Sequence, residues 1–449
     1  MSLRLYNTLG RKKEVFEPLD KAHIGIYACG PTVYDNIHVG NARPLVVFDV
    51  LVRLLRALYP KVTYVRNITD VDDKINQRAA DRHISIDDLC AQTIACFHED
   101  AEALFVKAPD IEPRATHHIE QMIDMINALI DKGFAYEAEG HVLFAIGQMP
   151  DYGQLSRRTL DMMRAGARVE VAPYKKDAGD FVLWKPSEAS LPGWDSPWGR
   201  GRPGWHIECS AMTAAYLGKV FDIHAGGLDL IFPHHENEIA QSCCAHGTSH
   251  MANYWVHNGY VTVDGEKMSK SVGNFTTVRD ALAKHRGEAV RYALLNAHYR
   301  APLDYSDGAV LEAKQALDRL YRAAGDAMPA ESLPDDFMNA LQDDLNTPLA
   351  LSILHELAKS ANKGDGDAAS ALKGCAQMLG LLNHTQSEWL QGDDNQEGLS
   401  EADIKAAIEA RQQARMDRDF AKADAIRDEL AEQGIQLLDG PEGTSWQRQ

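Results

Sequence analysis

The sequence predicts an α/β domain whose parallel sheet is interrupted by an insertion, followed by an α-helical domain and a small C-terminal module. Strand, helix and strand patterns follow one another over 23–29, 42–58 and 61–68, an order typical of a parallel sheet. This alternation is lost near residue 133 and resumes near residue 205. From residue 277 onward the pattern is helical almost throughout.

The first half of the sheet domain is extended by two predicted helices, over 85–106 and 114–131, and Gly133 ends the second. Regular patterns are then absent over 133–204, which we interpret as an insertion. The second half is predicted from a helix over 205–217, a strand over 219–224, a helix over 234–246 and a strand over 253–263. A polar linker over 386–398, two short helices and a tail over 439–449 complete the chain.

The composition excludes several classes of protein. Of 449 residues, 45% are apolar and 25% are charged, which argues against disorder. No stretch approaches the ~20 apolar residues of a membrane span, so we expect a cytoplasmic protein without a membrane partner. Seven scattered cysteines favour thiols or metal ligands over disulfides. The net charge of −19 repels nucleic acid, so RNA binding would need local basic surface.

Two segments have the character of phosphate-binding sites. His38-Val39-Gly40-Asn41 follows a strand and starts a helix, where backbone N–H groups bind anions and a histidine can donate to phosphate. A plain strand-to-helix turn explains this segment equally well. Lys267-Met268-Ser269-Lys270-Ser271 is more specific, because two lysines in a loop rich in serine and glycine can hold a polyphosphate.

A metal site is possible but is not established by spacing. His234 and Glu238 are four residues apart, on one face of the predicted helix. Cys209 lies on an earlier helix and Cys29 ends the first strand. A single cysteine is usually a buried apolar residue, and a helical His/Glu pair is usually a solvated face. The residues alone leave both interpretations open.

Longer motifs resemble a known family. Segments 29–35 (CGPTVYD), 67–74 (NITDVDDK), 204–210 (GWHIECS) and 232–238 (FPHHENE) resemble cysteinyl-tRNA synthetases, in that family's order. The lysine segment resembles the signature loop of class I aminoacyl-tRNA synthetases. His38-Val39-Gly40-Asn41 resembles their His-x-Gly-His element, with Asn41 in place of histidine.

The resemblance implies residue roles, a Rossmann-type catalytic domain and no editing domain. It implies one zinc ion per chain on Cys29, Cys209, His234 and Glu238. It implies that cysteine binds near Cys29, Gly30, Thr69 and Trp205. ATP, with Mg²⁺, is expected to contact His38, Gly40, Asn41, Gly227, Asp229, Lys267 and Lys270.

The implied reaction activates cysteine with ATP and loads it onto tRNA(Cys). Zinc deprotonates a coordinating thiol, whereas a hydroxyl is a poor zinc ligand. A site that depends on such a bond can reject serine by ~10⁴-fold or more.

The tail contains the predicted RNA contacts. Arg411, Arg415 and Arg418 recur at helical spacing, although interleaved aspartates make a solvated face the plainer interpretation. The end of the chain resembles the family's anticodon-recognition segment, which implies roles for Asp439 and for Trp446 as a base-stacking ring.

These inferences define expected domains. They are a catalytic domain over 1–120 and 204–265, a connective insertion over 121–203, a signature loop and stem-contact region over 266–310, a helical domain over 311–390 and an anticodon-binding module over 400–449. We expect a monomer. The alternatives are a zinc-dependent ligase that joins cysteine to glucosaminyl-inositol, which lacks such a module, and an inactive paralogue that only binds RNA.

Overall fold

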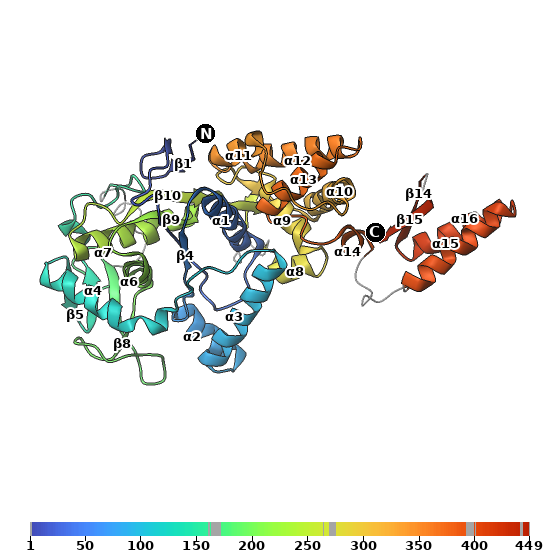
Figure 1. Cartoon of the computed structure of the whole chain (residues 1–449). Coiled ribbons are helices and arrows are strands. Elements are labelled where there is room, and N and C mark those ends of the chain that lie inside the picture. The colour runs from blue at the N-terminus through green and yellow to red at the C-terminus, as the bar shows by residue number, and fades with distance from the viewer. Residues whose placement is uncertain are drawn as a thin grey trace. The chain divides into compact units, whose positions relative to one another are not determined.

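The computed structural model describes residues 2–159, 162, 172–263, 265–268, 275–391, 399, 401–440 and 443–448. The chain forms two compact units. The first contains residues 1–313, 335–352 and 378–380, and the second contains 314–334, 353–377 and 381–449. Figure 1 labels the elements in chain order from the N-terminus, in blue, to the C-terminus, in red.

A parallel sheet in the order β10-β9-β3-β4 forms the centre of the first unit (Figure 1). All five residues of β3 are buried, as expected for a parallel strand covered on both faces. Because β3 pairs with β9, the sheet joins the two halves on either side of the insertion, which confirms the predicted split sheet. The strands are β3 (Ile24–Ala28), β4 (Val62–Arg66), β9 (Phe221–Gly227) and β10 (Ala252–Asn258).

Two crossover helices determine where a ligand can bind on this sheet. Helix α1 (Val39–Leu58) connects β3 to β4, and α7 (Glu236–His246) connects β9 to β10. The two connections run toward opposite edges of the sheet. Since such connections are right-handed, the helices cover opposite faces, and a crevice is expected where the strand order reverses, at the carboxyl ends of β3 and β9.

The insertion is more regular than the sequence indicated. It contains a four-stranded antiparallel sheet in the order β5-β6-β7-β8. Our prediction of an irregular region was wrong because strands of three to six residues are too short to show a period. The strands are β5 (Ala135–Ala138), β6 (His141–Phe144), β7 (Phe181–Pro186) and β8 (Gly201–Pro203).

A continuous apolar cluster fixes the insertion against the helices of the sheet domain. It contains buried residues from α4 (Ile119–Asp131), from β7 and from α6 (Trp205–Leu217), including Leu129, Trp184 and Met212. Helix α7 joins the cluster through Ile239 and Ala240. The cluster therefore holds in place two helices, α6 and α7, on which predicted metal ligands lie.

The remaining elements of the first unit are short or peripheral. Helix α2 (Asp73–Arg82) was not predicted, because only Ile75 and Ala79 of its ten residues are buried. The other elements are β1 (Arg4–Asn7), β2 (Lys12–Val15), α3 (Ile86–Ala103), β11 (Val261–Val263), β12 (Glu266–Lys267), α8 (Val278–Leu282), α9 (Gly287–Leu295), β13 (Leu303–Asp304), α11 (Asp335–Gln342) and the 3-10 helices Ala115–His117, Ile146–Gln148 and Leu228–Leu230.

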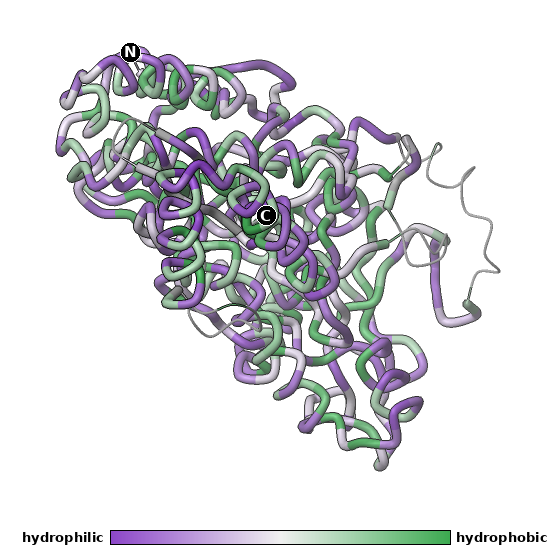
Figure 2. Tube along the Cα trace, turned by 90° about the vertical axis from the view of Figure 1, so that its right-hand side faces the viewer, coloured by the Kyte–Doolittle hydropathy of each residue, from purple (hydrophilic) through white to green (hydrophobic). Residues whose placement is uncertain are grey.

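The second unit is helical and ends in a hairpin of strands. Asp419 caps α16, and its side chain accepts a hydrogen bond from the Lys422 N–H. No described helix is long and apolar enough to cross a membrane, and hydrophilic and hydrophobic residues alternate along the trace (Figure 2). The elements from residue 307 onward, some shared with the first unit, are α10 (Asp307–Ala324), α12 (Thr347–Ala361), α13 (Gly366–Met378), α14 (Gln386–Gln391), α15 (Glu401–Met416), α16 (Phe420–Glu432), β14 (Ile435–Gly440) and β15 (Gly443–Arg448).

Candidate active site and metal centre

The crevice expected from the topology is a cavity of about 530 Å³ in the first unit. Residues from the carboxyl ends of β3 and β9 line it, together with the start of α1. It therefore brings together side chains predicted to serve different ligands. The predicted site residues that line it are Cys29, Gly30, His38, Gly40, Asn41, Trp205, Gly227 and Asp229.

The start of α1 is held by a reciprocal cap between two predicted phosphate-binding residues. The Asn41 backbone N–H donates to Nδ1 of His38 at 3.2 Å, and the His38 backbone N–H donates to Oδ1 of Asn41 at 3.4 Å. This is a capping box, with histidine and asparagine in the places usually taken by Ser/Thr and Glu. Asn41 thus has a defined structural function where the related element has histidine.

Both ends of the lysine segment are attached to α1. The Val39 N–H donates to the Thr276 carbonyl at 3.0 Å, and the Val278 N–H donates to the Ile37 carbonyl at 2.9 Å, after the segment. Before the segment, the buried guanidinium of Arg43 donates to the carbonyls of Gly259, Tyr260, His298 and Ala301.

The lysines themselves are described only in part. Lys267 belongs to β12, which pairs with β11 opposite Thr262. Met268 is buried and lines the cavity. The predicted contact of Lys270 lies outside the described residues.

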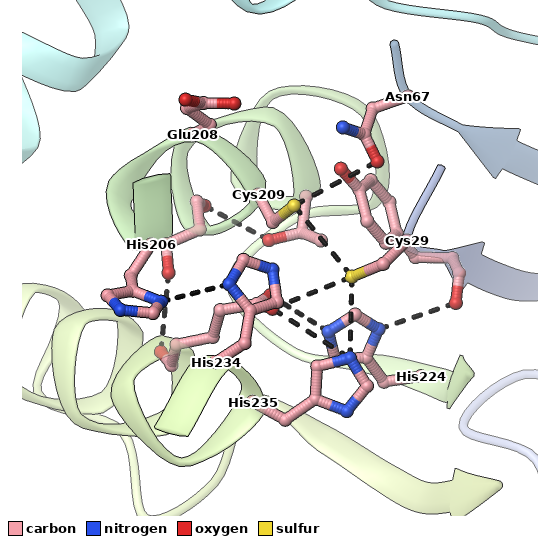
Figure 3. Close-up of polar contacts among 12 residues, drawn as sticks. Cys29, Asn67, His206, Glu208, Cys209, His224, His234 and His235 are labelled. Carbon is pink, nitrogen blue, oxygen red and sulfur yellow. Dashed lines mark hydrogen bonds and ion pairs between the residues drawn. The ribbon is translucent and has the colours of Figure 1, made fainter. Parts of the chain in front are cut away.

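Four predicted metal ligands converge beside the cavity, and Figure 3 labels Cys29, Cys209 and His234 among them. Cys29 follows β3, Cys209 lies on α6, His234 lies in the π-helical turn Ile231–His235, and Glu238 lies in the first turn of α7. The Sγ atoms of Cys29 and Cys209 are 3.8 Å apart, and Cys29 Sγ is 3.6 Å from Oε1 of Glu238. Nε2 of His234 is 3.0 Å from that same oxygen.

The chemistry of this cluster fits a bound cation. Burial and the neighbouring Cys209 and Glu238 raise the pKa of the Cys29 thiol well above its ordinary value. Burial lowers the pKa of His234 well below its ordinary value, so its ring is neutral and has a lone pair to offer. Thiolates beside a carboxylate repel one another, and a bound divalent ion would replace this repulsion by attraction to its positive charge. Two sulfurs, one imidazole and one carboxylate form a donor set that zinc accepts.

A chain of hydrogen bonds runs from Gly30, the residue after Cys29, to Glu208, the residue before Cys209. The Gly30 N–H donates to Oδ1 of Asn67 at 2.9 Å, and Nδ2 of Asn67 donates to the Thr69 hydroxyl at 3.2 Å. The Thr69 hydroxyl in turn donates to Glu208 at 3.0 Å. A Cβ at residue 30 would lie 1.6 Å from the Asn67 carbonyl oxygen, so only glycine fits there. Thr69 is 1% exposed and is not among the residues that line the cavity.

Trp205 lines the cavity beside the metal cluster, by which we mean the four predicted metal ligands Cys29, Cys209, His234 and Glu238. Its ring stacks on that of His234, with centroids 4.2 Å apart and planes inclined by 21°. Nδ1 of His234 is 2.9 Å from Nδ1 of His206, so a second histidine orients the first. Trp205 is 38% exposed and presents the rest of its ring to the cavity.

Arg411 and Trp446, two of the predicted tRNA contacts, are buried rather than exposed. Arg411 is 5% exposed and forms a two-bond pair with Asp439 at 2.8 and 2.9 Å, so these two side chains bind each other. Trp446 is 6% exposed and belongs to an apolar cluster with Ile404, Ile408, Leu430 and Ile435. Its ring would have to leave that cluster to stack on a base.

Two groups of residues were missed by the sequence argument. His224, His235 and His257 lie buried beside the metal cluster, but nothing in their spacing distinguishes them from core residues. Phe420 is 60% exposed at the start of α16, next to the exposed Arg418. An aromatic residue among arginines in the α15–α16 turn was a signal that the sequence did offer.

Comparison with known proteins identifies the family. Residues 15–315 match the model of the class I (C) tRNA synthetase catalytic domain, 336–384 match the DALR domain, and 398–446 match the cysteinyl-tRNA ligase anticodon binding domain. The chain is 59% identical to a cysteine–tRNA ligase of Paramagnetospirillum magneticum and 60% identical to one of Rhodospirillum centenum, over the whole of both chains in each pair. The chain belongs to the cysteine–tRNA ligase family.

Solved structures agree with this family assignment at the level of the fold. A Mycobacterium tuberculosis methionyl-tRNA synthetase in complex with methionyl-adenylate has a TM-score of 0.56 at 16% identity, covering 80% of this chain and 89% of that one. A putative arginyl-tRNA synthetase from Campylobacter jejuni has a TM-score of 0.52 at 16% identity, covering 82% and 94%. These likenesses show that the chain shares its fold with these two structures.

Proposed function

We propose that this chain activates cysteine with ATP and transfers it to the terminal adenosine of tRNA(Cys). One observation supports this most strongly: the donors Cys29, Cys209, His234 and Glu238 adjoin the cavity that His38 and Asp229 line. A thiol-binding metal and a phosphate-binding helix start would then serve the same small ligand.

The donor set is proposed to hold one zinc ion. When bound, zinc supplies a positive charge that stabilises the thiolate form of the substrate. Trp205 would cover the Cβ of cysteine, since its ring lies on His234 and faces the cavity. The Asn67, Thr69 and Glu208 chain would keep Gly30 and the end of β3 in position, because its Asn67–Thr69 and Thr69–Glu208 hydrogen bonds are buried.

ATP is proposed to bind between α1 and the end of β9. Gly227 and Asp229 would contact the adenosine, and His38, Gly40 and Asn41 would bind the phosphates together with Mg²⁺. In the first turn of α1 the Val39 and Asn41 N–H groups already donate to Thr276 and His38, so the Gly40 N–H is the one proposed to donate to a phosphate. Lys267 and Lys270 would contact the pyrophosphate as its charge develops.

Activation then needs little acid–base chemistry. The cysteine carboxylate oxygen forms a bond to the α-phosphorus, and the bond from that phosphorus to pyrophosphate breaks. A ribose hydroxyl of tRNA next attacks the carbonyl carbon of the adenylate, and AMP leaves. Positioning and charge stabilisation supply most of the acceleration.

tRNA recognition is assigned to residues 400–449. Arg415 and Arg418 are exposed and would contact phosphate. Arg411 and Asp439 would act mainly as a pair that ties α15 to β14. We assign base stacking to Phe420, whose ring is exposed, and retain Trp446 as a second candidate.

The decisive experiment is ATP–pyrophosphate exchange with each amino acid, with zinc measured on the same sample. We expect exchange with cysteine, none near that rate with serine, and about one zinc per chain. Exchange that is equally fast with serine would refute discrimination by the thiol. Charging of tRNA(Cys) by the same sample separates this function from the glucosaminyl-inositol ligase.

A further inference from the structure

A second histidine reaches the metal cluster from the same turn as His234. The ring of His235 is fully buried, and its Nε2 lies 3.4 Å from Cys29 Sγ and 4.0 Å from Oε1 of Glu238. Both neighbouring histidines, which Figure 3 labels, therefore approach the carboxylate of Glu238. Only His234 has a part in the ligand set implied by the family.

A third histidine occupies the other side of the same carboxylate. His224 lies on β9, is fully buried, and has Nε2 2.8 Å from Oε2 of Glu238. Its Nδ1 faces the Tyr27 carbonyl oxygen at 3.4 Å. When Nδ1 of His224 carries the ring hydrogen, it donates to that carbonyl, and the lone pair of Nε2 points toward Glu238. A cation between them would bind the Nε2 nitrogen and the Glu238 carboxylate together.

His235 is oriented as metal-binding histidines usually are. Its Nδ1 lies 2.8 Å from Nε2 of His257, and Nδ1 of His257 lies 2.8 Å from the Thr8 hydroxyl. When Nδ1–H of His235 donates to Nε2 of His257, and Nδ1–H of His257 donates to Thr8, Nε2 of His235 carries a lone pair. That lone pair is directed at Cys29. His234 has the same arrangement with His206 behind it. A ligand histidine commonly has a hydrogen-bond partner on its second nitrogen.

We propose that Cys29, His224, His235 and Glu238 form a second coordination position for the divalent ion of this site. Their donor atoms lie within 4.8 Å of one another, as do those of the first position. The two positions share Cys29 and Glu238, so one ion occupies one position at a time. The first offers two sulfurs, one nitrogen and one oxygen; the second offers one sulfur, two nitrogens and one oxygen. Both sets suit zinc.

The inference rests on the metal of the proposed function and adds a consequence. Cys209 and His234 belong only to the first position, whereas His224 and His235 belong only to the second. Loss of Cys209, by substitution or oxidation, moves the ion to the histidine side instead of releasing it. Loss of Cys29 removes a ligand from both positions and releases the ion.

The test measures bound metal and the cobalt spectrum, both independently of activity. Wild type and Cys209→Ser are each expected to bind about one ion per chain, and Cys29→Ser close to none. In cobalt-substituted protein, Cys209→Ser is expected to show about half the thiolate-to-cobalt absorption of wild type, because one sulfur remains. The double variant Cys209→Ser/His235→Asn is expected to lose the ion. Cys209→Ser/His117→Asn, which changes an exposed histidine instead, is expected to keep it.

The outcomes separate this inference from the proposed function. If the wild type binds no metal, the metal of the proposed function is itself refuted. Metal in wild type, but none in Cys209→Ser with an unchanged circular dichroism spectrum, would overturn the second position alone. If Cys209→Ser does not fold, His234→Gln breaks the first position through another ligand, and the same results are expected. Retention of metal by Cys209→Ser/His235→Asn would also overturn the proposal.

Discussion

The guanidinium of Arg43 donates a 2.7 Å hydrogen bond to the carbonyl oxygen of Ala301, 258 residues further along the chain. The same group donates to Gly259 at 2.9 Å and to Tyr260 at 3.1 Å, just before β11. Helix α1, whose N-cap residue is His38, is thereby attached to the strand that leads into the lysine segment. The two proposed phosphate-binding elements are parts of one assembly.

Arg43→Lys should weaken this assembly. A lysine cannot reproduce a planar fork that bonds four carbonyls. Losing two bonds at about 1 kcal/mol each should lower the melting temperature of a unit of this size by about 3 °C. The KM for ATP in pyrophosphate exchange should rise as well. Arg56→Lys, on the same helix but in an exposed pair with Asp110, is the matched control and should change neither value. Equal effects in both variants would contradict the assigned position of Arg43.

Metal binding should depend on Cys29. Cys29→Ser should contain close to no zinc by elemental analysis, whereas wild type should contain about one ion per chain. Cys375→Ser changes a buried cysteine of the other compact unit and should keep the ion. Zinc at wild-type level in Cys29→Ser would show that the ligand set is wrong.

Lys270→Ala should slow adenylate formation with little effect on cysteine binding. If its contact strengthens as charge develops on pyrophosphate, the exchange rate should fall by about 10²-fold or more. Lys284→Ala, which removes an exposed lysine paired with Asp307, should leave exchange unchanged. An unchanged rate in Lys270→Ala would exclude this lysine from the mechanism.

Phe420→Ala should impair charging of tRNA and leave pyrophosphate exchange intact. Loss of one stacked base should raise the KM for tRNA by the equivalent of about 1–3 kcal/mol. The ring is exposed, so the melting temperature should not change. Trp446→Ala should instead destabilise the module, since removing a core tryptophan costs about 3–5 kcal/mol. Normal charging by Phe420→Ala would point to another stacking residue.

The pair between Arg411 and Asp439 should make the C-terminal module sensitive to acid. Arg411 and Thr444 hold the pKa of Asp439 well below its usual range. A lowered pKa contributes stability above the unfolded value of ~3.9. This contribution is lost as the pH falls below that value toward the pKa of the folded state. Protection factors of the amides in 401–440, which are exchange rates normalised to the intrinsic rate at each pH, should therefore fall at pH 3 relative to pH 6, and the fall should be smaller in Asp439→Asn.

The sequence predicted elements with strong periodicity and failed where structure depends on distant partners. The parallel sheet was recognisable because β3 is an unbroken apolar run, as buried parallel strands are. Helix α2 was missed because it buries only Ile75 and Ala79. Trp446 was expected at the surface because a polar tail gives no sign that a hairpin will fold its ring against Leu430. Spacing could not assemble Cys29 with Cys209, and the family resemblance alone brought these ligands together.

The separation of the proposed metal ligands along the chain has a consequence for synthesis on the ribosome. Cys29 is translated 180 residues before Cys209, and Glu238 follows later still. Domains fold from the N-terminus as the chain emerges, so β3 is available long before α6 and α7 exist. Any ion held by this set is acquired only after both helices have left the ribosome. Until then the thiol of Cys29 in the nascent chain has no bound ion. A shortage of metal in the cell would therefore affect this protein late in its synthesis.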